Sequence, residues 1–204
     1  MKLFLIAFAI FGLAISAKSA NSNPPYKPGD TLKMYKRDGS APVEPGTAQL
    51  ICDGENLIIT ADFTDSDIGN SAVKNNEKTW TTGDVCEFFF QPVGREDYYE
   101  FHVTPNGITL QLHIPKLELL RVLPFEEKLF ESGFKSEAKV EKGHWTAKMI
   151  IPLSSLGKNV KFEGSLFAVC RYNYNKNWDG PEQTSSTPLP TSFHSPSEWH
   201  KISD

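Results

Sequence analysis

The chain has 204 residues, a formal net charge of −4 and an aromatic content of 12%, including four tryptophans. Its lysines and arginines are scattered and form no basic stripe, which argues against nucleic acid as a partner. A length of this order suits one domain with a core of its own. Aromatic residues beyond the needs of a core are typical of proteins that bind flat apolar ligand faces, although large β cores also consume them.

The chain begins with the pattern of a secretory signal peptide. Lys2 precedes an apolar run, residues 3–15, that ends in small residues and is too short to span a bilayer comfortably. We expect residues 1–17 to be this signal peptide, residues 18–30 (KSANSNPPYKPGD) to be a tether, and residues 31–204 to form one domain. The mature protein is then expected to be secreted or periplasmic, without a membrane segment.

The three cysteines do not form a metal-binding or redox motif. Cys52, Cys86 and Cys170 are widely spaced and contain no Cys-x-x-Cys pair. In an exported chain, one disulfide with one remaining thiol is one interpretation. Three buried thiols that act as small hydrophobic residues are the other.

The pattern of the remaining chain is overwhelmingly that of β-strands. Alternating segments separated by turn residues occupy residues 48–63, 85–91, 98–104, 107–114, 134–152 and 164–174. The only helix candidate is residues 115–132, which Pro124 interrupts. This order predicts an all-β fold with little helix, an antiparallel β-sandwich of the jelly-roll or immunoglobulin-like kind.

The hairpin within residues 80–107 contains a carboxylate and an imidazole among aromatic residues. Side chains alternate along a strand, so pairing Phe88 with Phe101 places Glu87 directly opposite His102. One face of the hairpin is then a dry core. The other is either a solvated face with an incidental charge pair or a ligand-facing one; Phe89, beside Glu87, favours the second interpretation.

Several segments in this order resemble the family 9 carbohydrate-binding modules. They are TADFTDSDI, the pattern Trp80…Asp84-x-x-Glu87-Phe-Phe, YYEFHVTPNG, HWTAKMIIPLSSLG and the terminal SFHSPSEWHKI, spread over residues 47–202. The resemblance implies a β-sandwich that clamps sugar rings between two aromatic side chains and hydrogen-bonds their hydroxyl groups. It implies a carbohydrate ligand, an oligosaccharide or polysaccharide of the xylan or glucan type, and a role in polysaccharide catabolism.

The resemblance also implies positions for the site. Trp80 and Phe193 fall on the two clamp positions, Glu87 on the sugar-binding carboxylate, and His102 where characterised sugar binders carry arginine. Asn173 falls where the family often places an amide. From its own surroundings, Trp178 is expected in a loop, where it either contacts the ligand or packs down the loop.

Three carboxylates in one strand-to-loop segment suggest a cation site. Asp62, Asp65 and Asp67 offer hard oxygen ligands at short spacing, which can hold calcium. The resembled family carries structural calcium as well. The other interpretation is an acidic turn with solvated caps, and no other cofactor is expected.

An enzyme and a haem-binding electron-transfer domain are the alternative functions. A glycoside hydrolase needs two carboxylates on one face, and the three-residue spacing points Asp84 and Glu87 to opposite faces. We therefore expect a non-catalytic protein. Haem would need an axial pair such as methionine and histidine, and neither Met34 nor Met149 lies in a loop beside a suitable histidine.

Overall fold

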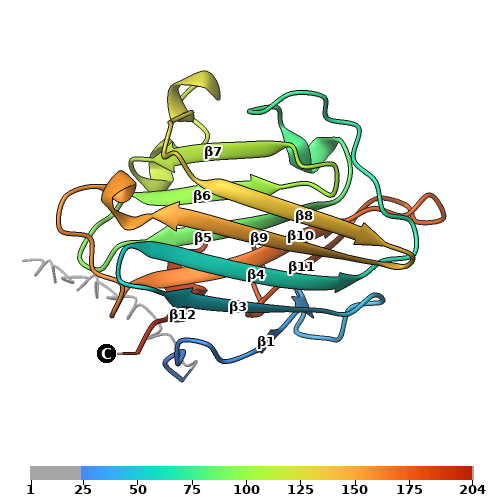
Figure 1. Cartoon of the computed structure of the whole chain (residues 1–204), viewed down its shortest axis with the longest axis horizontal. Coiled ribbons are helices and arrows are strands. Elements are labelled where there is room, and N and C mark those ends of the chain that lie inside the picture. Colours follow the sequence, from blue (N-terminus) through green and yellow to red (C-terminus); the bar gives the residue numbers. More distant parts are fainter. Residues whose placement is uncertain (1–23, 204) are drawn as a thin grey trace, which may run out of the picture.

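The computed structural model describes residues 24–203. Two antiparallel sheets lie face to face, with their strands running along the long axis of the molecule (Figure 1). The five-stranded sheet has the order β1 (Leu32–Lys33), β3 (Gly46–Cys52), β4 (Asn56–Thr64), β9 (His144–Pro152), β8 (Lys135–Glu141). The predicted antiparallel β-sandwich is confirmed.

The second sheet has seven strands. Its order is β2 (Tyr35–Lys36), β11 (Glu182–Ser185), β10 (Leu166–Asn173), β5 (Val85–Gln91), β6 (Tyr98–Val103), β7 (Thr109–Ile114), and β12 (His200–Lys201) also pairs with β10. The predicted hairpin register is confirmed, because Phe88 pairs with Phe101 and Glu87 with His102.

Helical structure among the described residues is limited to short 3-10 turns. They are η1 (Thr79–Thr81), η2 (Leu117–Leu119), η3 (Glu126–Lys128), η4 (Leu153–Leu156) and η5 (Pro196–Glu198). The helix candidate at residues 115–132 is therefore wrong: Pro124 separates η2 from η3, and the segment packs as a loop. No helix in the described part of the chain is long and apolar enough to cross a membrane.

The seven-stranded sheet is buried on both faces. Its inner face, with Phe88, Phe90 and Phe101, packs against the five-stranded sheet. Its outer face carries a second apolar cluster, in which Phe89 and Tyr98 are covered by residues of the loops at 117–129 and 186–199, Trp199 among them. Strands β5 and β6 are therefore buried along nearly their whole length, and any polar group on their outer face lies beneath loops.

The cysteines and the start of the domain can now be placed. Cys86 belongs to the inter-sheet core and Cys170 to the outer cluster, so the two thiols lie on opposite faces of the sheet. All three cysteines are free, and Cys52 is half-buried. Residues 1–17 lie outside the described residues. Within the described part of the expected tether, Tyr26 is buried in the core and its backbone bridges to Ile202, while the other residues up to 30 are exposed.

Candidate functional site

A cleft of about 390 Å³ lies over the outer face of the seven-stranded sheet. Its floor is formed by β5, β6, β7 and β10, from which Glu87, Glu100 and Tyr172 line the cavity. One wall is η1 together with residues 120–128, and the other is residues 192–194. The volume lies in the range of about 300–1,000 Å³ in which small-molecule sites usually fall.

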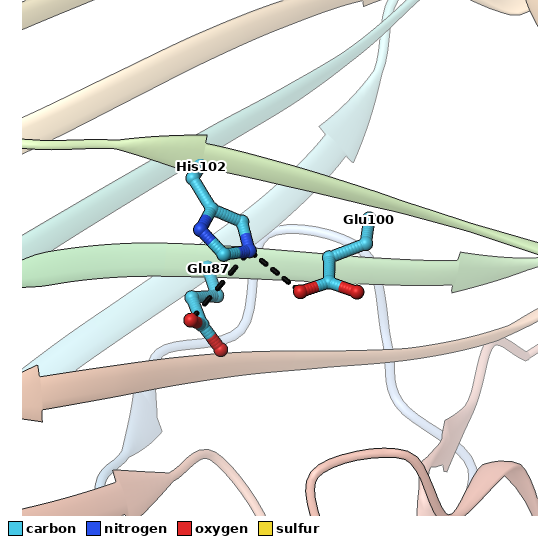
Figure 2. Close-up of side chains that lie close together, drawn as sticks. All are labelled: Glu87, Glu100 and His102. Atoms are coloured by element: carbon cyan, nitrogen blue, oxygen red, sulfur yellow. Dashed lines mark hydrogen bonds and ion pairs between the residues drawn. The ribbon is translucent and has the colours of Figure 1, made fainter. Parts of the chain in front are cut away.

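Three buried side chains meet at the floor of this cleft. His102 Nε2 lies 2.6 Å from Glu100 Oε1 and 3.5 Å from Glu87 Oε1. Figure 2 shows one imidazole nitrogen directed at both carboxylates. The other ring nitrogen, Nδ1, lies 2.8 Å from Thr79 Oγ1. The strand register produces this arrangement, because Glu87 faces His102 across the β5–β6 pair and Glu100 shares its face two residues earlier.

The environment shifts the pKa values of the two carboxyl groups in opposite directions. Burial raises the pKa of Glu87 to about 8, with the charge of His102 opposing this shift. Burial also acts to raise the pKa of Glu100, but His194, the hydrogen bond with His102 and the charge of Lys128 hold it below its usual value. At neutral pH Glu100 is therefore ionised, while Glu87 is protonated in most molecules.

The same burial and neighbouring charges shift the pKa values of His102 and His194. Burial acts to lower the pKa of His102, but the charges of Glu87 and Glu100 and the hydrogen bond with Glu100 raise it overall. Burial lowers the pKa of His194. Its Nδ1 lies 2.8 Å from the Tyr98 hydroxyl and 3.9 Å from Glu100 Oε2.

One floor atom is a free acceptor. Glu100 Oε2 is buried and has no hydrogen-bond partner among the described residues. A buried polar atom without a partner is costly, because it has lost its contact with water. Since Glu100 lines the cleft, a ligand hydroxyl that donates to this oxygen would remove that cost.

Aromatic rings form much of the two walls. Trp80 is half-buried and packs edge-on against Phe125, with ring centroids 6.1 Å apart. On the other side Tyr172 packs edge-on against Phe193, with centroids 5.4 Å apart. Trp80, Phe125 and Tyr172 are partly exposed to the cleft, whereas Phe193 is only 4% exposed. Phe193 therefore supports Tyr172 more than it offers a free ring face.

The structure brings some of the predicted site residues together. Trp80, Glu87 and Phe193 line the cleft, and His102 lies directly beneath the carboxylates with no exposed surface. Asn173 lies elsewhere, buried, with its amide donating to Glu44 Oε2 at 2.7 Å. Trp178 is half-buried in the loop between β10 and β11 and does not line the cleft.

The sequence interpretation missed two parts of the site. It found no second carboxylate on the face of Glu87, whereas Glu100 is on that face, with an oxygen within 4.8 Å of one of Glu87's. Strand alternation alone would have identified Glu100, because it is two residues from His102. The wall at residues 120–128 had no such signal, since it was interpreted as a helix.

The three aspartates expected to bind calcium each have a protein partner. Asp62 accepts from His144 Nε2 at 2.8 Å on the exposed surface. Asp65 is buried against Arg171 at 2.9 Å, and Asp67 accepts from the backbone of residue 176 at 2.8 Å. Calcium at this segment stays a prediction.

A different group has the donors of a metal site. Ligand atoms of Glu87, Glu100 and His102 all lie within 4.8 Å of one another. Two carboxylates and an imidazole could hold a divalent transition metal. In the structure, however, His102 Nε2 already bonds Glu100, so that a metal would have to replace this hydrogen bond.

A second hollow, of about 420 Å³, lies on the outer face of the five-stranded sheet. Its lining comes mainly from β3, β4, β8 and β9 and consists mostly of polar and charged side chains such as Thr60, Lys139 and Thr146. This is the pattern of a solvated sheet face. It has no aromatic ring and no buried titratable group in its lining, so the cleft over β5 and β6 is the better candidate.

Comparison of the whole fold with solved structures points to one kind of domain. A "putative carbohydrate-binding protein" from Bacteroides uniformis superposes with a TM-score of 0.65 at 16% identity, covering 84% of each chain. A family 9 carbohydrate-binding module from Caldicellulosiruptor kristjanssonii, solved with glucose, gives 0.59 at 11% identity, over 84% of this chain and 83% of that one. The fold is that of a family 9 carbohydrate-binding module.

A family 9 structure from the same organism, in complex with cellotriose, also matches. It gives a TM-score of 0.55 at 14% identity, over 80% of this chain and 77% of the other. No protein-family model and no curated protein matches the sequence. At these identities the likeness concerns the fold, and function has to be argued from the cleft.

Proposed function

We propose that this protein binds carbohydrate in the cleft over β5 and β6, without catalysing a reaction. The observation that carries the proposal is the combination of partly exposed aromatic rings, Trp80, Phe125 and Tyr172, with two carboxylates at the floor. A pyranose has an apolar C–H face that a ring can cover and hydroxyl groups that carboxylates can accept. The cleft offers both kinds of contact within one small volume.

Each residue of the cleft would have a separate role in sugar binding. Trp80 covers the sugar face, while Glu100 Oε2 and the Glu87 carboxyl accept hydroxyl hydrogen bonds. The bond to the ionised Glu100 is charge-assisted and contributes about 1–3 kcal/mol, whereas the largely protonated Glu87 forms an ordinary hydrogen bond. His102 does not reach the ligand; it fixes the orientation of both carboxylates through Nε2 and is itself held by Thr79.

The wider role is part of the proposal. The leader pattern at the N-terminus supports a secreted or periplasmic location. Similarity in fold to modules solved with glucose and cellotriose supports a ligand of the xylan or glucan type. A protein of this kind would serve polysaccharide catabolism by holding a chain or a released oligosaccharide.

The test replaces one cleft tryptophan and one control tryptophan. A glycan array identifies an oligosaccharide ligand, and calorimetry then compares wild type with Trp80→Ala and Trp178→Ala. Trp80→Ala should lose at least about tenfold in affinity, which corresponds to about 1.4 kcal/mol, because a cleft wall is deleted. Trp178→Ala should bind like wild type. Equal binding by Trp80→Ala and wild type would place the sugar site elsewhere, and absence of any glycan ligand would end the proposal.

A second candidate is glycoside hydrolysis, and one observation favours it. Two carboxyl groups near a cleft whose pKa values are driven apart are the usual arrangement of a general acid and a nucleophile or base. Glu87 would be the protonated acid and Glu100 the ionised partner. The hydrogen bond that His102 Nε2 donates to Glu100 Oε1 argues for binding instead, because this oxygen is already engaged within the protein. Turnover of an aryl glycoside or of the array ligand that disappears in both Glu87→Gln and Glu100→Gln would establish the enzyme.

A haem function has no support in the geometry. Met34 and Met149 are both buried in the inter-sheet core, so neither thioether lines the cleft.

A further inference from the structure

We propose that the sugar bound in this cleft is acidic, carrying a carboxylate or a sulfate group. The inference rests on the proposed function and specifies its ligand. Its basis is the charge of the lining: Arg37, Lys78, Arg121 and Lys128 all border the cleft. The only acidic residues in the lining are Glu87 and Glu100, and both lie at the floor.

The four cations stand on both sides of the opening. Lys78, Arg121 and Lys128 belong to the wall that contains Trp80 and Phe125, and Arg37 lies on the side of Ser192 and Phe193, where it donates to the Thr191 carbonyl. Arg37, Lys78 and Arg121 are exposed. A ligand held between the walls would therefore meet positive charge at both edges.

The positive charge of these side chains is not neutralised by the protein. Lys78 Nζ lies 5.2 Å from the centroid of the Phe125 ring, and Arg37 bonds neutral oxygens of Gln183 and Thr191. Lys128 Nζ donates to the carbonyls of Leu120 and Leu123 at 3.0 and 2.8 Å. Within residues 24–203, none of the four cations that line the cleft forms an ion pair with a carboxylate.

Several cations elsewhere on the molecule are paired with carboxylates, whereas none of the four at the cleft is paired with a carboxylate of the described residues. Lys36, Arg95, Lys116, Lys139 and Lys176 each lie within 4.0 Å of a glutamate or aspartate oxygen. The chain as a whole is negative, with a formal charge of −4. A group of unpaired cations around an aromatic cleft on an acidic protein therefore concentrates the positive potential where a ligand enters.

Lys128 indicates that this charge belongs to the site. It is only 7% exposed, and its ammonium is held by two carbonyls of the same loop that forms the cleft wall. Its charge also acts on Glu100 at the floor. A buried ammonium bonded only to neutral oxygens keeps its charge available to a ligand, and an arginine fork such as that of Arg121 matches a carboxylate or sulfate in shape.

The positions of these side chains determine how an acidic sugar would be oriented in the cleft. The apolar sugar face lies against Trp80, and hydroxyl groups reach the floor carboxylates. The acidic substituent is then directed outward, to the cations at the rim, since the carboxylates below would repel it. This orientation predicts that esterifying the sugar carboxylates weakens binding, although the rest of the sugar is unchanged.

The experiment compares a xylo-oligosaccharide that carries a glucuronate substituent with the same oligosaccharide methyl-esterified, by calorimetry at low and at raised salt. A sulfated disaccharide forms a separate arm that distinguishes sulfate from carboxylate. The acidic sugar that fits should bind at least about tenfold tighter than its neutral form. Raising the salt to about 0.5 M should reduce the difference, since exposed charges are screened.

Variants locate the effect. Arg121→Gln and Lys78→Gln should each weaken the acidic ligand several-fold, and by more than they weaken the esterified one. Lys74→Gln, the same charge change on an exposed lysine outside the cleft, should alter neither. If neutral sugars bind at Trp80 and acidic ones bind no more tightly, the charge inference fails while the proposed function stands. If neither form binds and no array ligand is found, the proposed function fails first.

Discussion

Replacing Glu87 by glutamine tests the electrostatics of the floor without changing its shape. Burial raises the pKa of this carboxyl from 4.5 to about 8, so the folded protein keeps a proton that the unfolded chain releases. A group of this kind contributes stability that is complete below about pH 4.5 and is lost as the pH rises toward 8. Glutamine cannot release a proton, so the variant lacks this loss.

The magnitude follows from the linkage between protons and folding. Each pH unit over which the folded state holds one extra proton lowers the free energy of unfolding by about 1.4 kcal/mol. Between about pH 5.5 and about pH 7.5, wild type should therefore lose about 3 kcal/mol relative to Glu87→Gln. Urea unfolding followed by tryptophan fluorescence, extrapolated to water at each pH, measures this difference.

A second buried carboxyl provides the control. Burial raises the pKa of Asp84 to about 7, with backbone hydrogen bonds from Tyr174 and Gly69 opposing this shift. Asp84→Asn should remove the part of the pH dependence of the unfolding free energy that Asp84 causes, which ends near pH 7. The part that Glu87 causes should remain and should be measurable above pH 7. A difference between Glu87→Gln and wild type that does not change with pH would mean that Glu87 is ionised throughout, and the reasoning about the floor would be refuted.

Two further predictions concern the frame around the cleft. Arg171→Met leaves the fully buried Asp65 without its charged partner at 2.9 Å and should cost about 3–5 kcal/mol in urea unfolding. Recovery should require Asp65→Leu as well, and a single variant with unchanged stability would show that water replaces the arginine. Gly83→Ala should destabilise the fold by more than about 2 kcal/mol, because φ is 144° and the new Cβ would lie 2.6 Å from Asn70 Cα. Gly94→Ala is the control: its φ is 74°, its Cβ would point into open space, and the substitution should cost only about 1 kcal/mol. Equal melting shifts for the two glycine variants would contradict the close approach at Gly83.

Much of the fold could be predicted because its signals are local. Alternation in VCEFFFQ and YYEFHVT determines which side chains share a face, and the register of the hairpin follows from that pattern. The same alternation places Glu87 and His102 together. It does not show that His102 is fully buried, because Thr79 and Trp80, which contact its ring, belong to the η1 turn outside the strand pattern.

The parts that could not be predicted are set by loop packing. Apolar spacing at residues 115–132 resembles that of a helix. In the structure Leu120 and Leu129 pack onto the outer sheet face, and Lys128 donates to the carbonyls at 120 and 123. Asn173 was expected at the ligand because the family resemblance implies an amide at this position. Its side chain instead bonds Glu44, a residue from a distant loop whose location no strand pattern reveals.

The buried cluster of Glu87, Glu100 and His102 on the outer sheet face lowers the stability of the fold. Two carboxylates and an imidazole lose their hydration there, and apolar side chains of similar size would pack without that cost. The cluster also leaves Glu100 Oε2 without a hydrogen bond. Structural needs do not explain such an arrangement, because the inner face of the same strands is filled with phenylalanine. A ligand that donates hydroxyl hydrogen bonds to the floor does explain it, since the polar atoms are positioned before binding and little rearrangement is then needed.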